Sequence, residues 1–400
     1  MSITACYVVK DEQKFLDESL KSIKEIADEI IVLDTGSTDN TLEIAKNFTD
    51  KVISYAPKQK HAGAGQEARN ESLKYATKEW ILVIDGDEIF DKDSINELKC
   101  LTTNPKSIAY TVIQRNYTFN LHAPNFRFAN KFTFPGYYDN RITRLFKNDL
   151  RLKFTGNIHE QIDASVISSG EKITGSNLVL HHLRELKGKE KEKQLAYLQT
   201  NLDTLKSEPD NIACNLGAAI IYHNQLHDYN KAIHYYFKTL ELDNKNLKAL
   251  INLSTLLIEQ KNLDAANEII GQGLKYHPES DELLNNKAVC LIHAQKYEEA
   301  EGIIEVILTA DKENANALMN KGFISISRKE YDKAVEIYSK IINLAPNYID
   351  VRLNKASVHI LKKENNEAIE EAKEVLKLDR ENEKAKKIIA VLNLRNHSKP

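Results

Sequence analysis

The stretch WILVIDGDE, residues 80–88, joins an uninterrupted apolar run to an acidic turn. A short apolar run bounded by such a turn predicts a buried strand. Ligands of open α/β sheets bind outside the carboxyl ends of strands. Asp85 and Asp87 flank Gly86, so one carboxylate can reach a hard cation while the other reaches a ribose hydroxyl or a metal-bound water. The stretch therefore predicts a site for a charged ligand, with a solvated loop as the alternative reading.

The surrounding residues, up to about 180, alternate apolar runs with amphipathic stretches, which predicts an α/β sheet with covering helices. We expect strands at 3–9, 29–33, 51–55 and 80–84, and helices at 15–26, 66–76 and from the polar turn 34–40 to about 47. Residues 108–180 are rich in aromatics and short strand-like pieces, and we expect them to build the acceptor side.

Beyond this segment, landmarks recur every 34 residues. Each repeat has an alanine, and three positions before it stands a residue that is aromatic in most repeats. The alanines are Ala232, Ala266, Ala300, Ala334 and Ala368, and the earlier residues are Tyr229, Leu263, Tyr297, Tyr331 and Asn365. A small residue lets paired helices approach closely, and the larger one fills the gap between them. The pattern resembles tetratricopeptide repeats over about residues 213–380.

Three segments follow from these patterns. Residues 1–187 are expected to form the α/β domain, and 188–212 a helical connector that includes a leading helix at 194–205. Residues 213–400 are expected to form an all-α repeat solenoid that ends with a capping helix at 381–394.

The composition excludes several partners. The 55 basic and 58 acidic residues give a net charge of -3, which lacks the cationic excess of a nucleic-acid-binding surface. Apolar runs are far shorter than the about 20 residues of a membrane helix, so we expect no transmembrane segment. The start of the chain lacks a signal-peptide pattern and the cysteines are widely spaced, so we expect a cytoplasmic protein with reduced thiols.

Four motifs resemble family 2 glycosyltransferases of the GT-A fold, a Rossmann-like nucleotide-sugar domain, over about residues 1–185. They are DTGSTD at 34–39, ARN at 68–70, WILVIDGDE at 80–88 and GNIHE at 156–160. The resemblance implies a nucleotide-sugar donor, with a UDP-sugar such as UDP-glucose favoured. Enzymes that combine this domain with tetratricopeptide repeats include glucosyltransferases of bacterial surface polysaccharide and S-glycosyltransferases that modify cysteines of glycocin bacteriocin peptides.

The resemblance also implies roles for single residues. Asp87 would ligate Mn²⁺ or Mg²⁺, and Asp85 would contact the ribose or a metal-bound water. Other expected donor contacts come from Val8 and Val9 at the base, Asp34 at the base or ribose, Gly86 within the acidic turn, and Arg69 at the nucleotide or diphosphate. Asp11 and Glu12 stand where the family often has Asn-Glu, which leaves the base-side contacts open.

His181 and Arg144 each have two possible roles. His181 stands where such enzymes often carry a late histidine that completes the metal or diphosphate site, and the alternative is a structural histidine. His182 is the second candidate for that role, and the family's usual small aromatic-glycine sequel is replaced by Leu183 and Arg184. Arg144 either reaches a phosphate or orders its own loop.

Glu160 is the candidate catalytic base, with His159 beside it. Inverting sugar transfer needs a group that removes the acceptor's proton while a metal takes up charge on the leaving diphosphate. The alternative is that Glu160 only forms an ion pair with Arg141, Arg144 or Arg151.

The repeats also carry a column of asparagines 34 residues apart: Asn252, Asn286, Asn320 and Asn354. Their position on the first helix of each repeat predicts that they face the concave groove. A row of amides there can donate to and accept from an extended peptide backbone. Alternatively, each asparagine bonds the neighbouring repeat and fixes the stacking.

These observations predict a metal-dependent, inverting glycosyltransferase with a peptide or protein acceptor, modified at cysteine or serine and recruited by the repeats. The alternatives are a glucosyltransferase acting on surface polysaccharide or a lipid-linked glycan, and a repeat scaffold with an inactive nucleotide-sugar domain. The repeats are also a possible homodimer surface.

Overall fold

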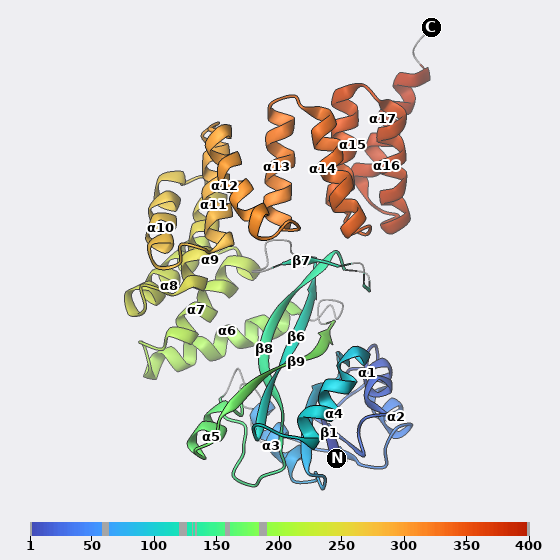
Figure 1. The fold of residues 1–400 in the computed structure, drawn as a ribbon, viewed down its shortest axis with the longest axis vertical. Coiled ribbons are helices and arrows are strands. Elements are labelled where there is room, and N and C mark those ends of the chain that lie inside the picture. The colour runs from blue at the N-terminus through green and yellow to red at the C-terminus, as the bar shows by residue number, and fades with distance from the viewer. Residues whose placement is uncertain are drawn as a thin grey trace. The chain divides into compact units, whose positions relative to one another are not determined.

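The computed structural model describes residues 2–57, 64–119, 126–129, 131–132, 134–156, 161–183 and 190–397. The chain divides into two compact units. The first comprises Met1–Tyr117 and Asp139–Ser207, and the second comprises Thr118–Tyr138 and Glu208–Pro400. The first is an α/β unit and the second is built mainly of paired helices (Figure 1). The predicted fold class, an α/β domain followed by an all-α repeat region, is confirmed.

The α/β unit centres on a mixed sheet with the strand order β3-β2-β1-β4-β8-β6-β9-β5. The strands are β1 (Ile3–Val9), β2 (Glu29–Asp34), β3 (Val52–Ser54), β4 (Trp80–Asp85), β5 (Glu88–Phe90), β6 (Ala109–Thr118), β8 (Gly136–Lys147) and β9 (Ile173–His182), and β7 (Arg127–Phe128) pairs with β8. The helices are α1 (Leu16–Ile23), α2 (Thr41–Lys46), α3 (Ala64–Leu73), α4 (Ile95–Thr103), α5 (Asp163–Ser168) and α6 (Glu190–Ser207), with a 3₁₀ turn at Lys92–Ser94.

The register of the central strands brings their carboxyl ends together. β1 runs parallel to both β2 and β4, with Val9 opposite Asp34 and Val8 opposite Asp85. β8 runs antiparallel to β4. The strand-like pieces expected after residue 108 prove to be the longer strands β6, β8 and β9 of this same sheet.

Both faces of the sheet are buried, which explains why β1 and β4 read as continuous apolar runs. One face packs Tyr7 and Trp80 against Leu16 and Leu20 of α1. The opposite face packs Cys6 and Ile81 with residues that include Phe146 and Phe154. Alternate residues of one strand therefore serve two cores.

The repeat unit is a series of helix pairs. Its helices are α7 (Ile212–Ile221), α8 (Tyr229–Leu242), α9 (Leu247–Glu259), α10 (Leu263–Tyr276), α11 (Asp281–His293), α12 (Tyr297–Ala310), α13 (Ala315–Ser327), α14 (Tyr331–Leu344), α15 (Ile349–Lys362), α16 (Asn365–Leu378) and α17 (Glu383–His397), with a π-helical turn at Tyr222–Leu226. The landmark alanines are fully buried, as the close approach of helices requires. Among the described helices, none is both long and apolar enough to cross a membrane.

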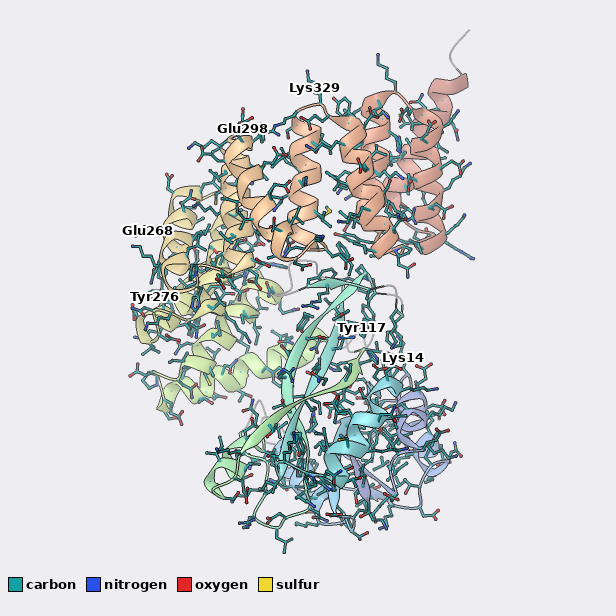
Figure 2. The ribbon with its side chains drawn as sticks, in the orientation of Figure 1. Lys14, Tyr117, Glu268, Tyr276, Glu298 and Lys329 are labelled. Atoms are coloured by element: carbon teal, nitrogen blue, oxygen red, sulfur yellow. The ribbon has the colours of Figure 1, made fainter. Side chains whose placement is uncertain are left out.

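The turn inside each pair repeats as regularly as the alanines. A left-handed residue stands at 34-residue intervals, with φ between 53° and 65°: His227, Lys261, Gln295, Lys329 and Lys363. Lys329 is labelled at the turn between α13 and α14 in Figure 2. A non-glycine residue in this region is uncommon, so the turn geometry is imposed by the helix pair on either side of it.

Candidate active site

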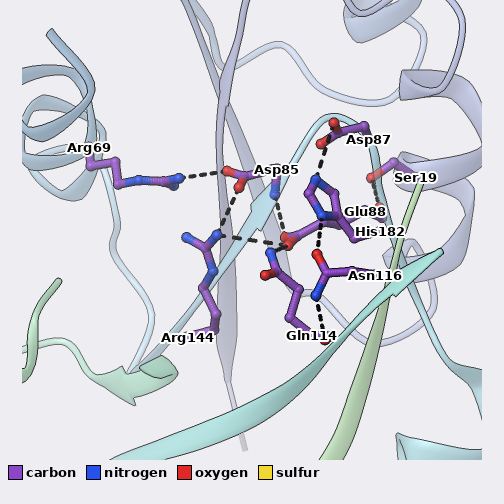
Figure 3. Close-up of polar contacts among 9 residues, drawn as sticks. All are labelled: Ser19, Arg69, Asp85, Asp87, Glu88, Gln114, Asn116, Arg144 and His182. Atoms are coloured by element: carbon purple, nitrogen blue, oxygen red, sulfur yellow. Dashed lines mark hydrogen bonds and ion pairs between the residues drawn. The ribbon is translucent and has the colours of Figure 1, made fainter. Parts of the chain in front are cut away.

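Strand β4 ends at Asp85, whose carboxylate lies between two arginines (Figure 3). Arg69 Nη2 of α3 lies 2.7 Å from Asp85 Oδ1, and Arg144 Nη2 of β8 lies 2.7 Å from Asp85 Oδ2. Burial opposes ionisation, but the charges of Arg144 and Arg69 outweigh it, so the pKa of the Asp85 carboxyl lies well below its usual range. Asp85 is therefore an anion with both oxygens engaged.

Asp87 is buried and faces a histidine. His182 Nε2 lies 3.4 Å from Asp87 Oδ2. The other ring nitrogen, His182 Nδ1, donates to Asn116 Oδ1 at 2.7 Å, while Asn116 Nδ2 donates to the carbonyl of Gln114 at 3.0 Å. This chain of bonds places the proton on Nδ1 and turns Nε2 toward Asp87.

The contact with Asp87 also changes the ionisation of the histidine. Burial disfavours the imidazolium, but the hydrogen bond to Asp87 and the nearby carboxylates raise the pKa of His182 above its ordinary value. The Asp87 carboxylate therefore stabilises the charged form of the His182 ring.

Between the two aspartates, Gly86 is required by space. A Cβ at this position would lie 2.8 Å from Cγ of Glu12. With any other residue, either the turn or the Glu12 side chain would have to shift. The glycine therefore allows the acidic turn to pack against Glu12.

Glu88, which was not singled out from the sequence, ties the acidic turn to β6. Its side chain is fully buried. Glu88 Oε2 accepts the backbone N–H of Asp85 at 2.9 Å, and Glu88 Oε1 accepts Gln114 Nε2–H at 2.5 Å. Arg144 Nη2 lies 3.8 Å from Glu88 Oε1. The available clue was the acidic residue that closes the quoted stretch, but its partner Gln114 depends on strand pairing.

Asp34 lies next to these residues but satisfies its own turn. It accepts the N–H of Gly36 at 3.0 Å and of Ser37 at 3.1 Å, and it also accepts the Ser37 hydroxyl. Gly36 has φ +103°, which only glycine adopts readily. Val8 and Val9 sit beside Asp85 and Asp34 through the strand register. The predicted base-side and acidic residues therefore share one edge of the sheet.

The neighbouring histidine points elsewhere. His181 Nδ1 lies 3.1 Å from the hydroxyl of Tyr117, and His181 Nε2 lies 3.5 Å from Asp91 Oδ1. His182 is the histidine whose ring nitrogen lies 3.4 Å from Asp87 Oδ2. Residues next to each other on a strand face opposite sides of the sheet, so the choice between them depends on register.

The proposed base lies outside the described residues, as both His159 and Glu160 do. The arginines considered as alternative partners of Glu160 have other contacts. Arg144 bonds Asp85, Arg141 Nη1 donates to the carbonyl of Ser176 at 2.6 Å, and Arg151 pairs with Asp149.

The asparagines of the column differ in their hydrogen-bond partners. Asn286 Nδ2 donates to Ser254 Oγ at 2.9 Å and to Thr255 Oγ1 at 3.1 Å, both on the preceding repeat. Asn320 Nδ2 lies 3.4 Å from Asn285 Oδ1. Asn252 Nδ2 instead donates to the carbonyl of Lys248 within its own helix. All four asparagines, including Asn354, are half-buried.

The described residues contain no group of three or more His, Cys, Asp or Glu side chains arranged as a metal site. Asp87 and His182 nevertheless present an oxygen and a nitrogen to one position. Mg²⁺ is usually held by one or two carboxylates together with substrate phosphates and waters. Asp87 therefore fits a cation that binds together with a diphosphate, and His182 is the side chain beside it.

Both the N-terminal and the C-terminal part of the chain match known protein families. Residues 4–163 match the glycosyl transferase family 2, and residues 223–280, 257–321 and 325–392 match the tetratricopeptide repeat. A TPR repeat-containing protein of Synechococcus elongatus is 32% identical over 42% of this chain and 36% of its own length. The SPbeta prophage-derived glycosyltransferase SunS of Bacillus subtilis is 33% identical over 40% of this chain and 34% of its own length.

The chain therefore spans about a third of the length of these relatives. Among solved structures, the type IV pilus biogenesis factor PilW is 18% identical over 50% of this chain and 94% of its own, with a TM-score of 0.44.

Proposed function

We infer that this chain is a glycosyltransferase that uses a nucleotide-sugar donor, with a UDP-sugar favoured. The chain joins a match to the glycosyl transferase family 2 to tetratricopeptide repeats, which supports this inference. The observation that carries this inference is the acidic turn after β4, where Asp85 is ion-paired to two arginines and Asp87 faces His182. A turn with this charge arrangement at the carboxyl edge of a sheet is suited to a nucleoside diphosphate.

The side chains of the turn divide the work of binding. Asp87 and His182 would hold Mn²⁺ or Mg²⁺, and His182 replaces His181 in this proposal because of its position. When bound, the cation would neutralise charge on the departing diphosphate. Arg69 and Arg144 hold Asp85 in place and supply positive charge beside the same edge, which suits the phosphates of a donor. Val8, Val9, Asp34 and Gly86 remain proposed donor contacts.

Proton removal from the acceptor is assigned to Glu160, with His159 as its neighbour. An inverting displacement needs a base on the acceptor side. A cysteine thiol is partly ionised near neutral pH, with an ordinary pKa of about 8.5, so sulfur needs less help from a base than a hydroxyl does. Glu160→Gln should therefore lower transfer to serine far more than transfer to cysteine, and equal losses would reject this role.

The acceptor is proposed to be a peptide or protein held by the repeats, in a cytoplasmic enzyme. Support comes from the repeats themselves, which bury their own cores and leave a helical surface for partners. The half-buried column Asn252, Asn286, Asn320 and Asn354 is the proposed groove. A homodimer through the same unit stays a proposal, and the solution mass of the full chain tests it.

A thermal-shift screen tests the donor. UDP-, GDP- and dTDP-sugars are added with and without Mn²⁺, and we expect a UDP-sugar to raise the melting temperature most when Mn²⁺ is present. Asp87→Asn should remove the Mn²⁺-dependent part of the shift, whereas Asp93→Asn, an exposed control on the next turn, should keep it. The absence of a shift with every nucleotide sugar would overturn the proposed function.

A further inference from the structure

The second unit contains a segment from outside the repeats. Residues Thr118–Tyr138, here named the arm, group with the repeat helices and not with the α/β unit. The arm connects β6 to β8, and its strand β7 pairs antiparallel with the start of β8: Arg127 lies opposite Tyr137, and Phe128 opposite Gly136. A Cβ on Gly136 would lie 2.2 Å from the carbonyl oxygen of Arg127, so this pairing requires glycine.

Two phenylalanines of the arm are buried. Phe126 is 5% exposed and Phe128 is 9% exposed, and their rings meet edge to face with centroids 5.6 Å apart. They belong to one apolar cluster with residues of α13, α14 and α15, including Leu318, Ile341 and Val351. A strand of two residues cannot bury two phenyl rings by its own pairing. The cover is therefore supplied by the repeat helices.

Other apolar clusters of the repeats differ in their make-up. The clusters around Ala300, Ala372 and Ala368 consist of repeat residues. The cluster of α13–α15 differs because it includes side chains from a distant part of the sequence.

The strands that enter and leave the arm also hold the acidic turn. β6 carries Gln114 and Asn116, which contact Glu88 and His182, and the arm begins two residues after Asn116. β8 carries Arg144, which bonds Asp85. Displacement of the arm would therefore act on the two strands that carry the partners of the acidic turn and of His182: β6, next to its junction with the arm, and β8, toward its far end.

We propose that α13–α15 form a docking site for the arm, with Phe126 and Phe128 as its anchors, and that docking couples the repeat unit to β6 and β8. The coupling is a property of the fold. Only an effect of this coupling on donor binding at the acidic turn would rest on the proposed function.

The chain contains a built-in reporter for this coupling. Trp80 is its only tryptophan and is fully buried in β4. It lies opposite Lys147, the last residue of β8, whose Nζ is 4.6 Å from the indole ring centroid. Trp80 emission therefore follows the α/β unit and its contact with β8, whereas far-UV circular dichroism follows mainly the repeat helices.

Urea unfolding of the full chain is followed with both probes. The double variant Phe126→Ala/Phe128→Ala should lower the midpoint of both transitions, the helical one by about 1 M or more. Phe128→Leu, which removes less apolar volume, should move both midpoints by less and serves if the double variant does not fold. The matched control is Phe323→Ala on α13, where the ring is 50% exposed and lies outside the cluster; it should leave both midpoints in place.

Each alternative result is decisive. A shift confined to the helical signal means that the arm docks without coupling to the α/β unit, which overturns the coupling. Unchanged midpoints for both probes mean that the rings are not docked and overturn the whole proposal. Neither outcome depends on a sugar donor, so the proposed function can fail while this inference stands, and the reverse.

Discussion

The acidic turn and the repeats differ in how far apart in sequence the residues lie that stabilise them. Each landmark alanine of the repeats is buried between helices that are neighbours in sequence. The acidic turn is instead held by side chains from α3, β6, β8 and β9, which arrive from distant segments. We conclude that a substitution in the repeats costs a local contact, whereas one at the turn disturbs several segments together. The predictions below test this contrast.

The largest effect is expected at Asp87. Asp87→Asn keeps the size of the side chain but removes the charge that faces His182 and that would hold a cation. We expect turnover, measured as nucleotide release from the donor with Mn²⁺ present, to fall by about 100-fold or more.

Asp93→Asn, on the exposed turn that follows β5, is the control and should retain activity. Full turnover of Asp87→Asn in the presence of a strong chelator would remove the metal from the proposed mechanism.

The next effect concerns the buried ion pairs of Asp85. Arg144→Gln removes one of its two arginines, whose side chain is 9% exposed, and leaves Glu88 without a nearby cation on that side. Breaking a buried pair in this way should lower the free energy of unfolding by about 3 kcal/mol. Urea unfolding followed by Trp80 emission measures it.

Arg151→Gln breaks a pair whose arginine side chain is 61% exposed, with Asp149, and should cost less than about 1 kcal/mol. Similar small losses in both variants would show that the Asp85 network is not what stabilises the turn.

The repeats and the acidic turn also differ in how much of each could be predicted from the sequence. The 34-residue landmarks located the helix pairs, because every signal of a repeat lies within its own segment. The strand 3–9 was also predicted with its observed bounds. The pairing of β8 with β4, and the long reach of β6, β8 and β9, were not predictable from local apolar patterns.

The choice between His181 and His182 shows the same limit at the site. Both residues lie on β9, and only the register that places Glu88 opposite His182 decides which of them approaches Asp87. That register depends on the pairing of β9 with β5 and β6, which are far apart in sequence. Local patterns therefore located the acidic turn but not its partners.

Within the repeats, two glycines allow the effect of local packing on stability to be tested. A Cβ on Gly322 of α13 would lie 2.7 Å from the ring of Tyr338, whereas a Cβ on Gly302 of α12 would meet nothing within 4 Å. Gly322→Ala should therefore destabilise the unit by about 1–3 kcal/mol through overpacking. Gly302→Ala should stabilise it by up to about 1 kcal/mol, because alanine is the better helix former.

Thermal unfolding followed by circular dichroism at 222 nm compares the two variants. Equal effects of the same sign would mean that helix propensity, and not the contact between neighbouring helices, dominates the stability of the repeats.

The smallest effect separates stacking from ligand binding in the asparagine column. Asn286 donates to Ser254 and Thr255 of the preceding repeat, so Asn286→Ala should cost about 1 kcal/mol of stability. Asn252 donates to the carbonyl of Lys248 within its own helix, so Asn252→Ala should leave the melting temperature nearly unchanged.

If the column also holds an acceptor, Asn252→Ala should weaken binding of an acceptor peptide while stability is retained. Asn286 contributes less to such binding, because its amide hydrogens are already used between repeats and only its carbonyl oxygen remains to accept a peptide N–H. Isothermal titration of an acceptor peptide with the two variants distinguishes peptide binding from repeat stacking. A loss of affinity in Asn286→Ala alone would assign the column to repeat stacking, because the affinity would then be lost through the disturbed helices.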